Sequence, residues 1–104
     1  DLVVIGVGIV PNVELAKVAG LEVDNGLVVD EFCRTADPDI VAAGDVTNHP
    51  NALYGQRLRL ESVANASGQA KTAAASICGK TIKKLNIPIN KPILLAGSEL
   101  AKIA

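Results

Sequence analysis

A glycine and an aspartate at positions 44 and 45 are the residues of this 104-residue sequence best placed to do chemistry. They follow the apolar run Ile40–Ala43, which predicts a buried strand of an α/β protein. Ligands of such proteins bind at the carboxyl ends of the strands. There a carboxylate can accept hydrogen bonds from ribose-like hydroxyls, and a glycine lets the ligand approach the backbone. The alternative is that Asp45 only caps the loop that follows.

A second glycine pair, Gly6 and Gly8, follows the run Leu2–Ile5. This run has no polar alternation, which predicts a central strand covered on both faces. Glycines after such a strand can let a dinucleotide pyrophosphate reach the backbone at a helix N-terminus. However, Pro11 stands where the G-x-G-x-x-G fingerprint has its third glycine. Without a larger pattern, a plain glycine turn is therefore the better interpretation.

The third candidate is the start of a helix at Glu61 and Ser62. Ser62 is a good N-cap residue, and the free N–H groups of a helix start favour an anion or an electron-rich carbonyl. An ordinary helix start is the simpler alternative. Arg57 and Arg59 alternate with leucines just before it, which indicates a strand with one solvated face rather than an anion clamp.

Cysteine and histidine usage favours neither a metal site nor a nucleophile. Cys33 and Cys78 lie far apart and neither belongs to a C-x-x-C pair. His49 is the only histidine, so it has no partner at a metal-ligand spacing. Cys33, His49 and Tyr54 also lack a nearby residue that would complete a nucleophile and base pair. We therefore predict no metal and no catalytic residue in the chain, and a reduced, cytoplasmic setting.

The elements that position these residues begin with a short helix and a hairpin. Apolar residues at mixed helical spacing from Val13 predict a helix that ends at Gly20. The turn-forming residues Asp24–Gly26 then separate Leu21–Val23 from Leu27–Val29, which predicts a small hairpin.

A loop and a long helix come next. Polar and turn-forming residues break any period over Val46–Arg57, which predicts a loop. A 3–4 spacing then predicts an amphipathic helix over Ser62–Cys78, terminated by Gly79. Its apolar face is expected to carry Val63, Ala66, Ala70, Ala73 or Ala74, and Ile77.

Beyond Lys80 the pattern weakens. Prolines interrupt it, and Glu99–Ala104 is long enough for only one or two helical turns. No second domain is predicted there. Asp1 precedes a strand-like run without a methionine or a signal peptide, so we expect a piece of something larger.

Composition limits the fold and the partners. The sequence is 49% hydrophobic but has only one Phe and one Tyr, so we expect a core of Ala, Val, Ile and Leu, as in an α/β layer. A net charge of -1 gives no electrostatic reason for a nucleic-acid or membrane partner. The longest apolar run, Leu2–Val10, is far shorter than the roughly 20 residues of a transmembrane helix.

Several short motifs, taken in order, resemble the flavoprotein pyridine nucleotide-disulfide oxidoreductase superfamily. These motifs are Asp1–Asn12, Asn25-Gly26, Arg34-Thr35, Asp37–Ile40 and Ala43–Asp45. The stretch Arg59–Ala66, followed by Gln69-Ala70, is similar to the ferredoxin reductases of the putidaredoxin reductase type. The resemblance covers about residues 1 to 80.

The resemblance implies part of a Rossmann-like FAD/NAD(P)-binding fold, with strands and one long packing helix. Residues 1–12 would end the NAD-binding domain, and residues 13–80 would form the C-terminal part of the FAD-binding domain. Residues 81–104 would be an atypical tail.

The resemblance also assigns cofactor contacts. Asp45 would bind the ribityl chain of FAD, and Val63 would touch its isoalloxazine ring. Glu61 and the first two glycines would lie near the nicotinamide of NAD(P)H. There is an independent physical reason for such a site, because a helix N-terminus aimed at the flavin stabilises negative charge that develops on reduction. The implied cofactor-binding residues are Gly6, Gly8, Gly44, Asp45, Glu61 and Val63.

The implied reaction moves electrons from NAD(P)H through FAD to a ferredoxin-type iron-sulfur protein. The chain has no FAD fingerprint and no complete NAD fingerprint, so we expect the 104 residues alone to be inactive. One alternative is a truncated, non-catalytic interaction module that self-associates through sheet edges and apolar faces. Another is a segment of a related NADH oxidase or nitrite reductase.

Overall fold

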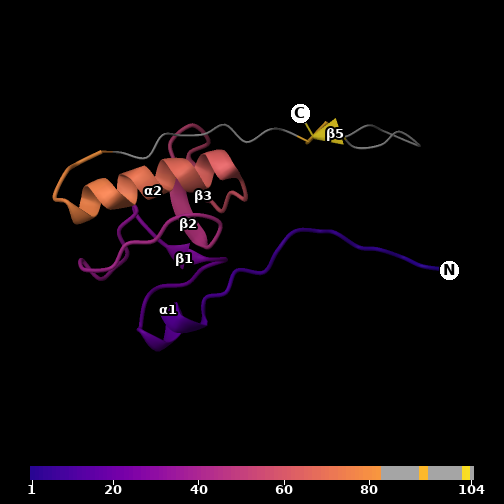
Figure 1. The fold of residues 1–104 in the computed structure, drawn as a ribbon, viewed down its shortest axis with the longest axis horizontal. Coiled ribbons are helices and arrows are strands. Elements are labelled where there is room, and N and C mark those ends of the chain that lie inside the picture. The colour runs from indigo at the N-terminus through magenta and orange to yellow at the C-terminus, as the bar shows by residue number, and fades with distance from the viewer. Residues whose placement is uncertain (83–91, 94–101, 104) are drawn as a thin grey trace.

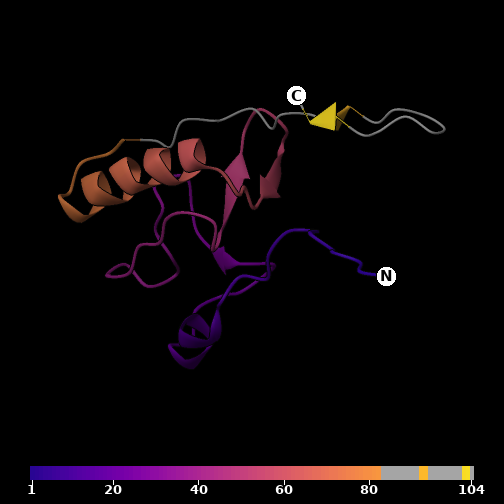
Figure 2. The same cartoon turned by 45° about the vertical axis from the view of Figure 1, so that its right-hand side comes forward.

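The computed structural model describes residues 1–82, 92–93 and 102–103 of this mixed α/β chain. Helix α2 lies beside a small sheet, and the residues before α1 extend away from this body (Figures 1 and 2). In chain order the elements are α1 (Glu14–Val18), β1 (Leu27–Val28), β2 (Thr47–Asn51), β3 (Gln56–Leu58), α2 (Val63–Ile77), β4 (Pro92–Ile93) and β5 (Lys102–Ile103).

The central sheet has three strands in the order β1-β2-β3. β1 is parallel to β2, with Leu27 opposite Thr47, and β2 is antiparallel to β3, with His49 opposite Leu58. The loop predicted over Val46–Arg57 is therefore wrong, because most of this segment is a strand hairpin. β2 is buried although its side chains are polar, so it carries no apolar alternation by which a strand is recognised.

Both helices end as predicted. After α1, the N–H of Gly20 donates to Lys17 O and the N–H of Leu21 donates to Ala16 O, which is a Schellman motif. α2 ends in the same way at Gly79, whose φ is 70°. These glycines are required because the motif places one residue in the left-handed region.

The start of α2 is also confirmed. Ser62 has an extended backbone, and its hydroxyl accepts a hydrogen bond from the N–H of Asn65 at 3.2 Å. This contact satisfies one of the N–H groups that a helix start leaves without a partner.

The predicted apolar face of α2 is correct at Ala73, which is buried, and wrong at its two largest members. Val63 and Ile77 are 84% and 72% exposed. The face turned to the protein is mostly polar, because the β2 side chains beneath it are polar and offer hydrogen-bond partners. For the same reason the expected aliphatic core is only partly present, with Leu27 and Val29 among its members. The buried residues of α2 are Asn65, Gln69, Thr72, Ala73 and Ala75.

Two predicted strands are absent from the described residues. Leu2–Ile5 is extended but pairs with no other strand, and its side chains are exposed. Ile40–Ala43 is half-buried and makes a single bridge, between Val41 and Arg34. A strand needs a neighbour to accept its backbone hydrogen bonds. The described part of the chain supplies none for Leu2–Ile5, and for Ile40–Ala43 it supplies only the short stretch around Arg34.

The predicted hairpin is present in its shortest form. Val23 and Leu27 form one antiparallel bridge around a turn in which Asn25 and Gly26 have φ values of 45° and 121°. A Cβ at position 26 would lie 2.7 Å from the carbonyl oxygen of Val46, so a side chain there is excluded by space as well as by backbone angle. The turn therefore brings β1 against the strand that follows Val46.

β4 and β5 form a separate antiparallel pair, with Pro92 opposite Ile103. The helical turns expected over Glu99–Ala104 are therefore wrong at Lys102 and Ile103, and the remainder of that segment lies outside the described residues. Among the residues that the structure describes, no helix has the length and apolar character to cross a bilayer.

Candidate functional site

The turn at Gly44 and Asp45 presents an exposed carboxylate on a tightly held backbone. Gly44 has a φ of 90°, in the region that favours glycine. Its carbonyl accepts the N–H of Thr47 at 3.0 Å and the Thr47 hydroxyl at 2.8 Å. The Asp45 side chain itself is exposed to solvent. The backbone is thus fixed while the carboxylate is available to a ligand.

The turn is tied to α2 by a buried amide. The N–H of Gly44 donates to Oε1 of Gln69 at 2.6 Å, and Nε2 of the same amide lies 3.0 Å from Nδ1 of His49. Asn65 reaches Gln69 Oε1 at 3.4 Å and donates to the carbonyl of Leu60 at 3.0 Å. The three polar side chains are fully buried. A buried polar network of this kind fixes the relative position of its elements.

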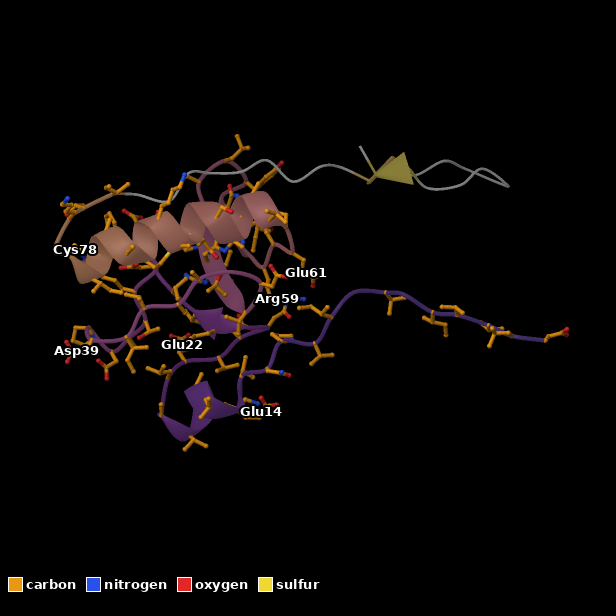
Figure 3. All side chains as sticks on the ribbon, in the orientation of Figure 1. Glu14, Glu22, Asp39, Arg59, Glu61 and Cys78 are labelled. Atoms are coloured by element: carbon orange, nitrogen blue, oxygen red, sulfur yellow. The ribbon has the colours of Figure 1, made fainter. Side chains whose placement is uncertain are left out.

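Arg59 joins several segments at the edge of this turn. Its Nη1 lies 2.8 Å from Glu61 Oε1 and 3.3 Å from the carbonyl of Asp45, and its Nη2 lies 3.4 Å from the carbonyl of Ile9. Figure 3 shows Arg59 and Glu61 close together where the N-terminal segment passes the body. A Cβ at Gly8 would lie 3.9 Å from both carboxylate oxygens of Glu61. Gly8, Asp45 and Glu61 are therefore brought together.

The first turn of α2 forms the neighbouring part of the site. A Cβ at Gly44 would lie 3.9 Å from the Cβ of Ala66, so the helix start and the turn are in contact. Val63, in the same first turn, presents an almost fully exposed apolar side chain. The helix start combines this surface with the partial positive charge of its free N–H groups.

Gly6 is the predicted site residue that stands apart. It lies on the extended N-terminal segment, and nothing lies within 4 Å of the position of its Cβ. Within the described ranges there is no group of three His, Cys, Asp or Glu side chains that could hold a metal ion.

Sequence reasoning missed two residues that organise the site. The alternation at Arg59 predicts a solvated face, yet its side chain is only 12% exposed and connects several segments. Gln69 was noted only within a motif. A usable signal was its spacing of four from Asn65, since two amides four residues apart in a helix share a face.

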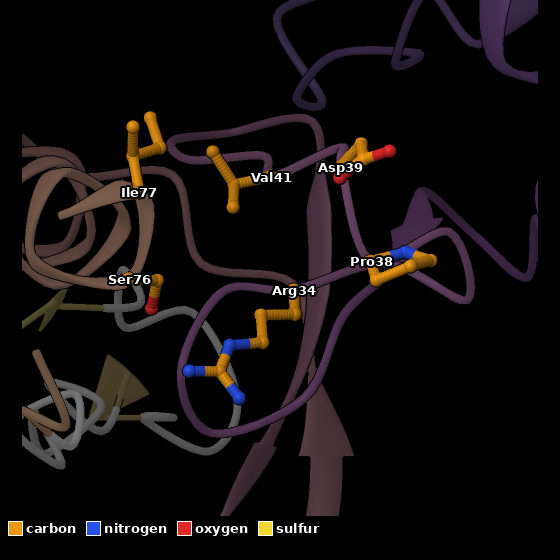
Figure 4. Close-up of a pocket in the computed structure, with 6 residues that line it drawn as sticks. All are labelled: Arg34, Pro38, Asp39, Val41, Ser76 and Ile77. Atoms are coloured by element: carbon orange, nitrogen blue, oxygen red, sulfur yellow. The ribbon is translucent and has the colours of Figure 1, made fainter. Parts of the chain in front are cut away.

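A hollow lies at the other end of α2 and contains none of the predicted site residues. It has a volume of about 180 Å³ (Figure 4). Beside it, the Ser76 hydroxyl donates to the carbonyl of Phe32 at 2.6 Å. Its lining residues are Arg34, Pro38, Asp39, Val41, Ser76 and Ile77.

Comparison with known proteins gives a consistent result. The family model described as pyridine nucleotide-disulphide oxidoreductase matches residues 1–70. The ferredoxin--NAD(+) reductase component of the anthranilate 1,2-dioxygenase system of Burkholderia cepacia is 56% identical over 79 residues. The match covers 76% of this chain and 20% of that protein. Putidaredoxin reductase of Pseudomonas putida is 51% identical over 80 residues, which cover 77% of this chain and 19% of that protein.

Solved structures agree in fold. The crystal structure of a ferredoxin reductase from Rhodopseudomonas palustris superposes with a TM-score of 0.75 at 43% identity. The superposition covers 85% of this chain and 22% of that one. The covalent complex of putidaredoxin reductase with putidaredoxin gives a TM-score of 0.68 at 50% identity, covering 73% of this chain and 18% of that one. This chain thus spans about a fifth of the length of the relatives it matches.

Proposed function

Because this chain belongs to the pyridine nucleotide-disulphide oxidoreductase family, we propose that it supplies part of the flavin site of an NAD(P)H-oxidising reductase. In this proposal the whole enzyme passes electrons from NAD(P)H through FAD to a ferredoxin-type iron-sulfur protein. The names of the relatives support it, since they are a ferredoxin--NAD(+) reductase component and putidaredoxin reductase. When bound, FAD supplies the exchange between two-electron and one-electron transfer.

The convergence of Gly8, Asp45 and Glu61 beside the start of α2 is the observation that carries the proposal. The residues fit a flavin. The exposed Asp45 carboxylate can accept hydrogen bonds from ribityl hydroxyls, and Gly44 supplies the positive-φ backbone of the turn that presents it. The exposed side chain of Val63 gives an aromatic ring a surface to pack on.

The protein groups around the bound flavin ring would then stabilise the charge that develops on it. The free N–H groups at the start of α2 stabilise negative charge that develops nearby. Glu61, Gly6 and Gly8 would face the nicotinamide, with Arg59 holding the Glu61 carboxylate in place. The residue roles are those of binding and orientation, and no residue of the chain is assigned a covalent or proton-transfer step.

The proposed domain arrangement follows from these roles. Residues 1–12 would close the NAD-binding domain, and residues 13–80 would belong to the FAD-binding domain. The structure that supports this division is the crossing of the N-terminal segment over the body at Arg59. Residues 81–104 would be a tail outside both. A cytoplasmic setting is proposed from the cysteine usage, since neither Cys33 nor Cys78 belongs to a pairing motif.

A second candidate function is a self-associating, non-catalytic module. The observation in its favour is the apolar N-terminal segment, where Val4 and Val7 are 85% and 91% exposed. Large exposed apolar surfaces mark interaction sites.

A segment exchange tests the proposed function. Residues 1–80 would replace the matching segment of putidaredoxin reductase from Pseudomonas putida, and FAD content and NADH-dependent flavin reduction would be measured. We expect the exchanged protein to retain FAD, and Asp45→Ala to weaken its FAD affinity by about tenfold. Asp24→Ala, which changes an exposed carboxylate at the hairpin turn, is the matched control. A folded exchange protein that binds no FAD would refute the proposal.

The isolated 104-residue chain separates the two candidates. FAD titration followed by fluorescence should show binding that Asp45→Ala weakens. If the chain binds no FAD and sediments as an oligomer, the module is favoured.

A further inference from the structure

Gln69 is buried, and its side chain is hydrogen-bonded to Gly44, a proposed cofactor contact that lies far from it in sequence. Its Oε1 accepts the N–H of Gly44, the residue before Asp45, across 25 positions of sequence. We propose that Gln69 is the positioning residue for the Gly44–Asp45 turn, and that the orientation of its amide, fixed by the Gly44 N–H, sets the tautomer of His49. The inference rests on the proposed function for the identity of the ligand that Asp45 meets.

The orientation of the Gln69 amide is fixed by a group that can only donate. The backbone N–H of Gly44 has no lone pair to offer, so the atom 2.6 Å from its nitrogen must be the amide oxygen. The Thr47 hydroxyl lies 2.9 Å from the same oxygen. A flipped amide would place an NH2 group against the Gly44 N–H, which costs the free energy of an unmade buried hydrogen bond.

This orientation determines the protonation of His49. With the amide oxygen turned to Gly44, the NH2 group of Gln69 faces Nδ1 of His49 at 3.0 Å. Nδ1 must therefore accept, and a neutral imidazole that accepts at Nδ1 carries its proton on Nε2. Both side chains are fully buried, so neither exchanges this contact for water.

The network links the ligand-side turn to the helix that forms the rest of the site. Gln69 is one helical turn after Asn65. The backbone N–H of Asn65 donates to the hydroxyl of the N-cap residue Ser62, and its side-chain amide donates to the carbonyl of Leu60. The backbone carbonyl of Gln69 also lies 3.6 Å from the Cys33 sulfur. A displacement of the Gln69 side chain therefore moves Asp45 relative to the start of α2, while leaving every proposed cofactor contact chemically intact.

Two variants separate positioning from general stability. Gln69→Leu removes the acceptor for the Gly44 N–H. Gln69→Glu keeps it, since one carboxylate oxygen replaces Oε1 and the other faces His49, which then must carry a proton on Nδ1. We expect Gln69→Leu to raise the FAD dissociation constant about tenfold and Gln69→Glu to stay within about threefold of the parent.

Nitrogen-15 NMR of the 104-residue chain supplies a readout that a merely structural role does not move. We expect His49 of the parent to show an unprotonated Nδ1 and a protonated Nε2, and Gln69→Glu to show a protonated Nδ1. The Gly44 amide proton should exchange slowly in both and rapidly in Gln69→Leu. A protonated Nδ1 in the parent, or a Gly44 amide equally protected in a folded Gln69→Leu, overturns the inference.

The same data distinguish this inference from the function on which it rests. If neither the parent nor the segment-exchange protein binds FAD, the proposed function fails, while Gly44 exchange and the His49 tautomer still decide whether Gln69 positions the turn. If FAD binds and Asp45→Ala weakens it, but folded Gln69→Leu binds as the parent does, the inference alone fails. Should Gln69→Leu not fold, the His49 tautomer is the test. An unprotonated Nδ1 in the parent and a protonated Nδ1 in Gln69→Glu support the inference, and any other result overturns it.

Discussion

Arg59 and Glu61 form an ion pair of 2.8 Å at the point where the N-terminal segment crosses the body of the protein. The same guanidinium reaches the carbonyls of Asp45 and Ile9, so one side chain fixes three pieces of backbone relative to one another. Arginine suits this task because its planar group carries five donors in a rigid arrangement. Arg59 therefore positions these segments as well as pairing with the charge of Glu61.

Removal of the Arg59 side chain should destabilise the fold. Arg59→Ala leaves the Asp45 and Ile9 carbonyls without their donor, and we expect the free energy of unfolding to fall by about 1–2 kcal/mol. Arg59→Lys keeps a cation for Glu61 but loses the planar group with several donors. It should therefore give an intermediate loss in the free energy of unfolding. Urea unfolding measures both. Equal midpoints for Arg59→Ala and the parent would show that the contacts of this guanidinium do not contribute to stability.

Glu61 should influence which form of the nicotinamide binds. The oxidised ring carries a positive charge that the reduced ring lacks, so a nearby carboxylate favours the oxidised form. In the segment-exchange protein we expect Glu61→Gln to weaken NAD+ binding about threefold more than NADH binding. Glu22→Gln, at an exposed position, is the control. Identical ratios in the two variants would remove Glu61 from the nicotinamide site.

Local signals in the sequence predicted the helix limits well. Ser62 and Gly79 bound α2 because a hydroxyl cap and a left-handed glycine act within one turn, and nothing distant is needed to interpret them. The hairpin at Asn25 and Gly26 is predictable for the same reason.

β2 is missed by sequence reasoning because its stability depends on partners. The polar residues of β2 are buried only because α2 brings an amide such as Gln69 over them, and apolar periodicity does not contain that information. Leu2–Ile5 has the composition of a central strand, yet no described segment pairs with it. The proximity of Gly8, Asp45 and Glu61 likewise follows from tertiary contacts of Arg59. Their roles toward cofactors stay predictions.

The N-cap of α2 should be measurable on its own. Ser62→Ala removes the acceptor for the Asn65 N–H, and we expect a loss of about 1 kcal/mol in the free energy of unfolding. Ser62→Asp should retain the stability, because a carboxylate both caps the helix and complements its dipole. Ser67→Ala changes an exposed serine inside the same helix and should be neutral or slightly stabilising. A loss equal to that of Ser62→Ala at position 67 would contradict a capping role.

Two glycines with positive φ should respond differently to alanine. At Gly26 the new Cβ would lie 2.7 Å from the carbonyl oxygen of Val46, so backbone must move. At Gly55, with a φ of 63°, nothing lies within 4 Å and only the left-handed backbone is penalised. We expect a loss of about 1 kcal/mol for Gly55→Ala and a clearly larger one for Gly26→Ala. Thermal unfolding compares them, and equal losses would refute the steric argument.

The exposed N-terminal segment should make the isolated chain associate with itself. Val4 and Ile5 are 85% and 76% exposed in an extended run that offers unpaired backbone groups as well as apolar side chains. Both features favour pairing of one edge with another. We expect sedimentation of the 104-residue chain to show concentration-dependent oligomers.

Charge in this segment should oppose the association. Val4→Lys together with Ile5→Lys removes two apolar side chains and adds like charges to a strand edge, a change that natural sheets use against edge pairing. We expect the double variant to shift the chain toward the monomer by at least about tenfold in dissociation constant. Leu15→Lys, which charges an exposed leucine of α1 instead, should leave the oligomers unchanged. If Leu15→Lys dissociates them and the double variant does not, the contact lies at α1 and the N-terminal segment is not the associating edge.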